Sequence, residues 1–213
     1  MAALLRALPS IARPGPADEA RPLKIVAFGD SLIAGFGLPA DDAFPAVLER
    51  ALRAEGYHVA ITNAGVSGDT ASAGLERLDW AIGDGADGVI LELGANDMLR
   101  GLDPEVTRSA LDSILAKLKE RHIKVLIAGM QASPSFGPEY KARFDAIYPA
   151  LAKKYHAPLY PFFLEAVAGD PSLKLKDGLH PNAAGVQHIV QGIFPSVRAL
   201  LDQFGAKALR SKE

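Results

Sequence analysis

Short apolar runs alternate with longer stretches of helical period along the chain from residue 24 onward. This alternation is typical of βαβ units, in which parallel strands are connected by helices. The runs that predict strands are 24–28, 57–63, 88–93, 124–130 and, less cleanly, 158–163. The run around Leu91 and Leu93 is almost continuously apolar, as expected of a strand covered by helices on both faces.

Helical periodicity is clearest over 104–121, where apolar residues recur on one face. They are Val106, Ala110, Ile114 and Leu118, widened by Leu111 and Leu115. Further helices are expected over 42–55, 70–82, 138–155 and 182–201. Pro45 fits the first of these because it falls in the first turn. The pattern therefore predicts a three-layer α/β/α domain with a flavodoxin-like parallel five-stranded sheet, whose site lies at the carboxyl ends of the strands.

Both ends of the chain are predicted to lie outside this domain, which we expect over 23–205. Residues 1–22 are rich in proline between charges, which is typical of a linker. Their apolar start also resembles a targeting segment, although Arg6 interrupts it. Two alternatives stay open: a flexible leader, compatible with a cytoplasmic protein, or a signal-peptide remnant, which implies a periplasmic or secreted one. Residues 206–213 are expected to form a tail.

Composition limits the kinds of molecule that the protein is expected to bind. The 213 residues are 49% hydrophobic and 23% charged, and the formal net charge of -2 gives no electrostatic reason to expect nucleic acid or an anionic membrane surface. No apolar run approaches the roughly 18 residues of a membrane span, so we expect no integral membrane segment. Cysteine is absent, which excludes disulfides and thiolate metal sites. A small neutral or apolar substrate fits best, and the oligomeric state is not indicated.

The first chemical signal is Phe28-Gly29-Asp30-Ser31-Leu32, which places Ser31 directly after a predicted strand. A serine hydroxyl becomes a useful nucleophile only when a base accepts its proton, so Ser31 needs a histidine brought close by the fold. A helix that starts after Ser31 would direct backbone N–H groups at developing negative charge. Taken alone, these five residues are equally compatible with an ordinary strand-to-helix turn.

The second signal is Asp177-Gly178-Leu179-His180, near the end of the last loop. Gly178 permits a bend that lets the Asp177 carboxylate reach Nδ1–H of His180, which would leave Nε2 free to act as a base. A loop aspartate that caps the next helix, beside a surface histidine, is the alternative. The other four histidines lack such a neighbour and are interpreted as surface or packing residues.

Two further loops offer hydrogen-bond donors for the oxyanion that acyl transfer generates. The backbone N–H of Gly68, in the loop after the second strand, is unobstructed by a side chain. The side-chain amide of Asn96, in the loop after the third, is a second donor. Each residue has an ordinary alternative role, Gly68 as a turn glycine and Asn96 as a helix cap.

Together the four blocks resemble the SGNH hydrolase superfamily, named for a serine, glycine, asparagine and histidine that occur here in the same order. The resemblance extends from about residue 24 to 201 and is strongest to the bacterial thioesterase, lysophospholipase and arylesterase branch, through GDSL, NAGVSGDT, LELGANDMLRG, IYPALAKKY and DGLHPN. It implies the SGNH hydrolase fold and a serine esterase that needs no metal or organic cofactor.

Carried over to this sequence, the resemblance implies Ser31 as nucleophile and Asp177 with His180 as the rest of a triad. It implies oxyanion donors from the Ser31 backbone N–H, the Gly68 backbone N–H and the Asn96 side chain. The branch usually has glycine where this chain has Ala95, and we expect only a local change in geometry. Since the base must be neutral, activity is expected to rise through roughly pH 6 to 7.

The acyl pocket is expected among apolar residues beside these motifs, each of which is equally compatible with a core position. They are Leu32, Met98, Leu99, Phe136 and Leu179. The resemblance implies short- to medium-chain acyl esters, aryl esters, thioesters or lysophospholipids as substrates.

Three rival interpretations remain. The same triad serves an acyltransferase, and a flavodoxin-like binding module would share the fold without catalysis. Against the module, no GxGxxG or Walker loop follows the first strand. A metallohydrolase built from Asp30, Asp97 and His180 has fewer ligands than metals usually require. The Gly-x-Ser-x-Gly nucleophile elbow is absent around Ser31, and 65–69 lacks its last glycine, which argues against an α/β-hydrolase fold.

Overall fold

A computed structural model describes residues 21–206 of the chain. Within that range, five strands form one parallel sheet in the order β2-β1-β3-β4-β5. They are β1 (Leu23–Gly29), β2 (Val59–Gly65), β3 (Gly88–Glu92), β4 (Lys124–Ala128) and β5 (Leu159–Tyr160). Residues 1–20 and 207–213, on which most of the predicted leader and tail fall, lie outside the described residues.

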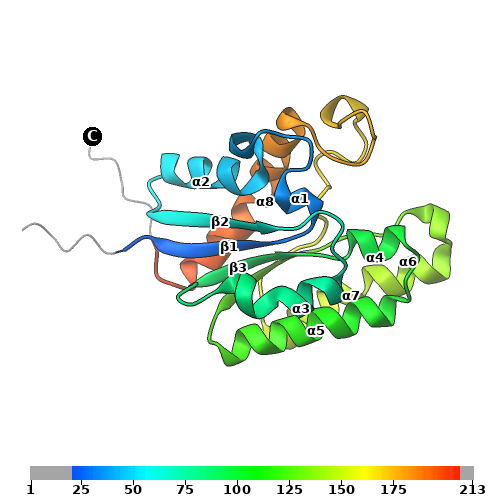
Figure 1. Cartoon of the computed structure of the whole chain (residues 1–213), viewed down its shortest axis with the longest axis horizontal. Helices are drawn as coiled ribbons and strands as arrows, with labels where there is room; N and C mark the ends of the chain where they lie inside the picture. Colours follow the sequence, from blue (N-terminus) through cyan, green and yellow to red (C-terminus); the bar gives the residue numbers. More distant parts are fainter. Residues whose placement is uncertain (1–20, 207–213) are drawn as a thin grey trace, which may run out of the picture.

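Helices cover both faces of the sheet, which confirms the predicted three-layer architecture (Figure 1). They are α1 (Ser31–Ala34), α2 (Phe44–Ala54), α3 (Ala71–Ile82), α4 (Ala95–Leu99), α5 (Pro104–Glu120), α6 (Pro138–Asp145), α7 (Ile147–Tyr155) and α8 (Ala183–Asp202). Helices α2 and α8 pack together on one face, whereas α3, α5 and α7 cover the other (Figure 1). Short 3₁₀ turns lie at Ala40–Asp42, Pro134–Phe136 and Pro171–Leu173. Among residues 21–206, no helix is both long enough and apolar enough to cross a membrane.

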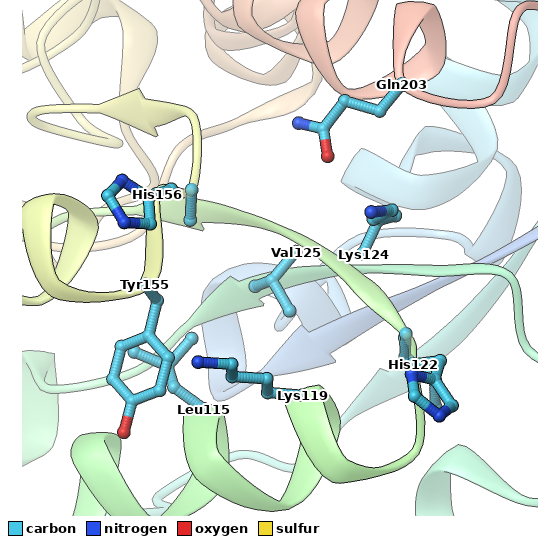
Figure 2. Close-up of a pocket in the computed structure, with 10 residues that line it drawn as sticks. Leu115, Lys119, His122, Lys124, Val125, Tyr155, His156 and Gln203 are labelled. Atoms are coloured by element: carbon cyan, nitrogen blue, oxygen red, sulfur yellow. The ribbon is translucent and has the colours of Figure 1, made fainter.

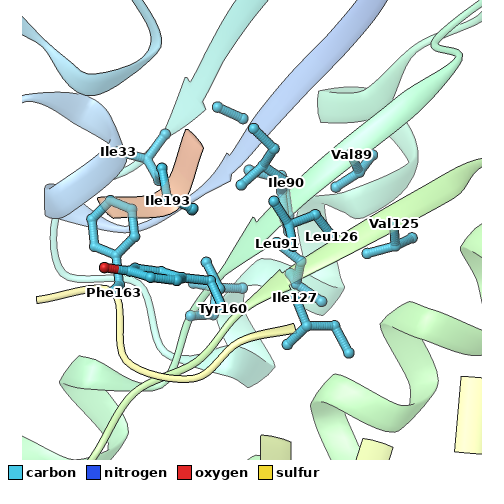
Figure 3. Close-up of a cluster of buried hydrophobic side chains, with 14 of the residues drawn as sticks. Ile33, Val89, Ile90, Leu91, Val125, Leu126, Ile127, Tyr160, Phe163 and Ile193 are labelled. Atoms are coloured by element: carbon cyan, nitrogen blue, oxygen red, sulfur yellow. The ribbon is translucent and has the colours of Figure 1, made fainter. Parts of the chain in front are cut away.

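The core lies on both sides of the sheet because the central strands are apolar on both faces. Every residue of β3 is buried, as the continuous apolar run predicted. Figure 3 shows Ile90, Leu91 and Leu126 of the central strands packed near Phe163 and Ile193, the last of which comes from α8. The strand ends are therefore held by packing from two helical layers.

The register of the sheet brings the predicted site segments to one edge. Strand β1 pairs on one side with β2, where Gly29 lies opposite Gly65, and on the other with β3, where Gly29 lies opposite Glu92. Ser31 follows β1 by one intervening residue, so it lies between the loops that leave β2 and β3. In Figure 1, α1 and α4 occupy this edge.

The predicted helix over 138–155 is wrong in one respect, because two helices replace it. Helix α6 ends at Asp145 and α7 begins at Ile147. Pro149 explains the break, since it has no N–H to donate to the carbonyl of Asp145 and its ring clashes with that carbonyl. The predictions over 42–55, 70–82, 104–121 and 182–201 agree with α2, α3, α5 and α8 to within two residues at each end.

The predicted strand over 158–163 is also shorter than expected, since β5 contains only Leu159 and Tyr160. Pro161 follows directly and cannot donate to a neighbouring strand. Beyond it, the Phe163 N–H still donates to the Gly129 carbonyl at 2.8 Å, so the chain continues beside β4 without regular pairing.

We predict that Leu118→Ala lowers the free energy of unfolding by about 2 to 5 kcal/mol, because Leu118 is fully buried on α5 and its truncation leaves a cavity. Val106→Ala on the same helix is the control. Although Val106 was predicted on the apolar face, it is 48% exposed near the start of α5, so its change should stay within about 0.5 kcal/mol. Urea unfolding measures both, and equal losses would contradict this assignment of the core.

Candidate active site

Ser31 lies at the first position of α1, immediately past the end of β1. Asp30 caps this short helix, since its carboxylate accepts the Leu32 N–H at 3.0 Å. The cap fixes the turn that carries Ser31, and the Ser31 side chain remains partly accessible. A helix of four residues is too short to be predicted from periodicity, although the turn itself was predicted.

The structure brings His180 to Ser31 across 149 residues of sequence. Nε2 of His180 lies 2.9 Å from Oγ of Ser31, and Nδ1 lies 2.7 Å from Oδ2 of Asp177. A carboxylate on Nδ1 favours the tautomer whose proton is on Nδ1, which leaves Nε2 as the acceptor for the serine proton. The arrangement can therefore perform base-assisted attack by Ser31.

Asp177 is held by its own loop as well as by the imidazole. Its Oδ1 accepts backbone N–H groups from Leu179 at 2.9 Å and His180 at 3.0 Å. The hydrogen bond from the His180 side chain, and then these two backbone bonds, lower the pKa of Asp177 to about 2. The carboxylate consequently stays ionised wherever a neutral histidine exists. Asn182, not Asp177, caps the following helix α8.

Two backbone N–H groups of the predicted oxyanion site have no hydrogen-bond partner of their own. Neither the Ser31 N–H nor the Gly68 N–H donates a hydrogen bond to any acceptor in the described part of the chain. Gly68 has φ +89°, a conformation that L side chains rarely adopt, and its carbonyl accepts from Arg100 at 2.7 Å. Unpaired N–H groups of this kind are suited to stabilising an oxyanion.

Asn96 lies in the first turn of α4 and is not its cap, since Gly94 has that position. The Asn96 amide nitrogen donates to Oδ2 of Asp30 at 2.9 Å and to the carbonyl of Asp69 at 3.0 Å. Both amide hydrogens are thus engaged. A substrate oxyanion can receive one of them only by sharing or displacing the Asp69 carbonyl.

Gly94 and Ala95 show why the branch's second glycine is dispensable here. Gly94 has φ +120°, and a side chain on it would meet the hydroxyl of Tyr148, so glycine is required. Tyr148 donates that hydroxyl to the Leu93 carbonyl at 3.0 Å. Ala95 is the first residue of α4 and has helical geometry, which alanine favours.

Arg77 forms several hydrogen bonds beside the site, and the sequence analysis did not predict them. From α3 it donates to the Gly29 carbonyl at 2.9 Å, to the Ala64 carbonyl at 3.0 Å and to the Asp69 carboxylate at 2.5 Å. Its guanidinium also lies 4.2 Å from the centre of the Phe28 ring. A charged residue within an amphipathic helix is normally read as part of its solvated face, so the sequence offered no clear signal.

A shallow hollow lies beside Ser31, and Phe36 forms one side of it. It is lined by Ser31, Leu32, Gly35, Phe36, Leu38, His180, Pro181 and Val186. The Phe36 ring lies 4.5 Å from that of His180, between centroids, and is 49% exposed. Phe36 was also missed, and its position between Gly35 and Gly37, five residues after Ser31, was the available signal.

The five predicted pocket residues are dispersed. Leu32 lines the hollow, and Met98 is buried in the core. Leu99 and Leu179 are about half exposed, and Phe136 packs against Tyr140 with ring centroids 5.3 Å apart. Only Leu32 thus contacts the space next to Ser31 in this structure.

The ligand set of the metallohydrolase alternative is not assembled. The Asp97 carboxylate accepts from the Ala71 N–H and the Thr107 hydroxyl, and Asp30 accepts from Leu32 and Asn96. Residues 21–206 contain no group of three histidine, cysteine, aspartate or glutamate side chains arranged to hold a metal ion.

A family model described as "GDSL-like Lipase/Acylhydrolase family" matches residues 27–188, which include Ser31, Gly68, Asn96, Asp177 and His180. The chain belongs to this family. The match covers most of the sheet and the whole of the edge described above.

Relatives of this chain include proteins that are named as esterases. "Esterase TesA" of Pseudomonas aeruginosa is 35% identical over 86% of this chain and 92% of its own, and "Arylesterase" of Vibrio mimicus is 39% identical over 74% and 80%. The crystal structure of AlinE4, an SGNH-hydrolase family esterase, is 48% identical, covers 85% of this chain and 98% of that one, and superposes with a TM-score of 0.73. This acylhydrolase is a carboxylic ester hydrolase, and these names do not favour the acyltransferase or binding-module alternatives.

A separate cavity among the described residues lies away from this site. It measures about 310 Å³ and is situated where β4 begins and α7 ends, at the opposite edge of the sheet (Figure 2). Lys119, His122, Lys124 and His156 surround it together with apolar residues, but none of the predicted site residues does. Cavity volume alone does not locate the chemistry, because the nucleophile and its base line the smaller hollow beside Phe36.

We predict that His180→Ala raises the pKa of Asp177 from about 2 toward its ordinary value of 3.8, because the imidazole hydrogen bond is the largest cause of the depression. The backbone donors remain, so the return is incomplete. Because the folded pKa is lowered, the stabilisation is present above pH 3.8 and is lost as the pH falls through about 2. NMR titration of the Asp177 carboxyl carbon measures the shift.

Asp170 provides the internal control for this titration. Its pKa is lowered by hydrogen bonds from the side chain and the backbone of Ser172, which His180→Ala leaves intact. An unchanged Asp177 midpoint in the variant would mean that the loop, and not the imidazole, sets its pKa.

Proposed function

We propose that the chain hydrolyses carboxylic esters through an acyl-enzyme on Ser31, with His180 as general base and acid and Asp177 as its orienting carboxylate. The observation that carries the proposal is the continuous hydrogen-bonded chain from Oγ of Ser31 through both imidazole nitrogens to Asp177. Such a chain activates an otherwise weak nucleophile.

In the first step Oγ of Ser31 forms a bond to the ester carbonyl carbon while Nε2 of His180 takes the hydroxyl proton. The carbonyl oxygen becomes an oxyanion, and the N–H groups of Ser31 and Gly68, which have no acceptor in the described part of the chain, are the proposed backbone donors for it. The tetrahedral intermediate then expels the alcohol, or a thiol from a thioester, which receives the proton from His180. An acyl-Ser31 ester remains.

In the second step water replaces the alcohol. His180 removes a proton from the water as the water oxygen bonds to the acyl carbon. The intermediate then collapses, the bond from the acyl carbon to Oγ of Ser31 breaks, and His180 returns the proton to Oγ as the carboxylic acid leaves. Ionised Asp177 stabilises the imidazolium in both steps. The expected rise of activity through roughly pH 6 to 7, where an ordinary histidine loses its proton, stays a prediction.

The proposed substrates are aryl esters and esters of short or medium acyl chains, with thioesters and lysophospholipids as further candidates. Support comes from the Vibrio mimicus relative, which is named an arylesterase, and from the hollow beside Ser31. Phe36 offers an exposed aromatic surface in contact with the His180 ring, against which a flat or apolar substrate group can pack.

Ser31→Ala is expected to lower hydrolysis of p-nitrophenyl butyrate by at least about 10⁴-fold, because it removes the proposed nucleophile. Intact mass after fluorophosphonate treatment should show one adduct on the wild type and none on the variant. Ser67→Ala is the matched control, since this exposed serine in the Gly68 loop should leave labelling and activity unchanged. Undiminished hydrolysis by Ser31→Ala would reject the serine mechanism.

Asn96→Ala is expected to lower kcat by about 10² to 10³-fold with a smaller change in KM, because an oxyanion donor acts mainly in the transition state. Gln187→Ala, which removes an exposed amide on α8, is the control. Steady-state kinetics on the same ester separates the two constants. A rise in KM with unchanged kcat would show that Asn96 binds the substrate without stabilising the oxyanion.

A further inference from the structure

Glu92 is a buried acidic residue directly beneath the turn that carries Ser31. It ends β3, lies opposite Gly29 of β1 and has no exposed surface. Oε2 lies 3.4 Å from the backbone N of Asp30, and Oε1 has no hydrogen-bond partner in the described part of the chain. Burial of an ionised carboxylate with so few donors is strongly unfavourable.

Asp30 is the second carboxyl group of this cluster and is equally inaccessible to solvent. Unlike Glu92, it accepts strong hydrogen bonds on both oxygens, from the Leu32 N–H at 3.0 Å and from the Asn96 amide at 2.9 Å. A carboxylate that must accept at both oxygens favours ionisation, whereas one without donors favours the neutral acid. The two carboxyl groups are neighbours, since Glu92 Oε2 lies 3.4 Å from the backbone N of Asp30, and two negative charges buried this close repel each other.

Neither carboxyl group forms an ion pair in the described part of the chain. The guanidinium of Arg77 reaches the neighbouring Gly29 carbonyl but is paired with Asp69. The buried Tyr148 hydroxyl, on α7, donates to the Leu93 carbonyl, and the negative charges of Glu92 and Asp30 are among the causes that raise its pKa. His180 is the one titratable base that influences Asp30. Burial, and then the charge of Asp30, raise the pKa of Glu92 well above its ordinary value, whereas burial raises the pKa of Asp30 to about 6. The proton therefore belongs to Glu92.

We propose that Glu92 is a positioning residue that remains protonated at neutral pH and donates its hydrogen bond to ionised Asp30, which in turn orients the Asn96 amide. The consequence concerns both hydrogens of that amide. Asp30 fixes one of them, and the other is thereby directed to the Asp69 carbonyl, at the loop that carries Gly68. Loss of the Glu92 donor leaves Asp30 with only the Leu32 and Asn96 donors, so its negative charge is less stabilised and the amide is held less firmly.

The inference rests on the proposed role of Asn96, but the protonation of Glu92 can be tested without measuring catalysis. Infrared difference spectra of wild type minus Glu92→Gln should contain the carbonyl stretch of a protonated carboxylic acid at neutral pH. Glu120→Gln, which changes an exposed glutamate at the end of α5, is the matched control and should show only loss of carboxylate bands. A carboxylate band in the Glu92 difference would overturn the proposal.

The second part is tested by comparing two replacements of similar length. Glu92→Gln retains a donor and should keep kcat within about threefold of wild type, whereas Glu92→Met lacks one and should lower kcat by about 10 to 10²-fold, less than the loss of an oxyanion donor itself. KM should change little in either variant. Equal kcat in both variants, or loss in Glu92→Gln alone, would overturn the positioning role.

Glu92→Thr provides a second donor-free variant, because threonine suits a strand and its hydroxyl is too short to reach Asp30. The infrared comparison needs only Glu92→Gln, so it decides the protonation even where a donor-free variant does not fold. Fluorophosphonate labelling of Ser31 separates the two proposals: a labelled protein without the acid band refutes only the role of Glu92, whereas an unlabelled one refutes the serine mechanism.

Discussion

The guanidinium of Arg77 connects the three chain segments that meet around Ser31. Its three hydrogen bonds reach the end of β1 at Gly29, the end of β2 at Ala64 and the loop carboxylate of Asp69. The side chains of Arg77 and Asp69 are only 9% and 13% exposed, so this ion pair is shielded from solvent. Removal of one partner of such a pair typically costs about 3 to 5 kcal/mol, because the other charge is left buried.

The position of this contact matters more than its energy. Gly68 precedes Asp69, so the same ion pair that fixes Asp69 also fixes the free N–H of Gly68 and the carbonyl that accepts from Asn96. Arginine is suited to this role, because its planar group donates in several fixed directions at once, which lysine does not. The relative placement of the serine turn and the Gly68 loop thus follows from one side chain on α3.

Much of the fold could be predicted because apolar periodicity reports burial directly. The strand over 88–93 and the helix over 104–121 were both recognisable from the spacing of their apolar residues, which the structure buries. The errors occurred where backbone chemistry overrides periodicity. Pro149 divides one apolar helical stretch and Pro161 ends one apolar strand, and in both cases the side-chain pattern continues past the break.

The residues of the site that follow strands were predictable, because the topology of a parallel sheet brings them together. Ser31, Gly68 and Asn96 each follow a strand, and parallel strands bring their carboxyl ends to one edge, so order along the chain implied proximity. Contacts that run between elements have no such signal. Arg77 resembles a solvated helix residue and Phe36 a loop aromatic. Glu92 alone carried a hint, as a charged residue inside an otherwise apolar run.

The donors around Ser31 differ in how ready they are before a substrate arrives. The N–H groups of Ser31 and Gly68 have no acceptor within residues 21–206, so no contact within this range must break before they bind an oxyanion. Unpaired polar groups are unfavourable for folding and persist where the surrounding structure fixes them, here the Asp30 cap and the Arg77 ion pair.

Asn96, by contrast, already donates both hydrogens of its side-chain amide. Asn96 can contribute only if one amide hydrogen leaves the Asp69 carbonyl for a more negative oxygen. An oxyanion is more negative than that carbonyl, whereas the carbonyl oxygen of an unreacted ester is not. The amide is therefore positioned to favour the transition state over the substrate, since only developing charge competes with the bond that it already has.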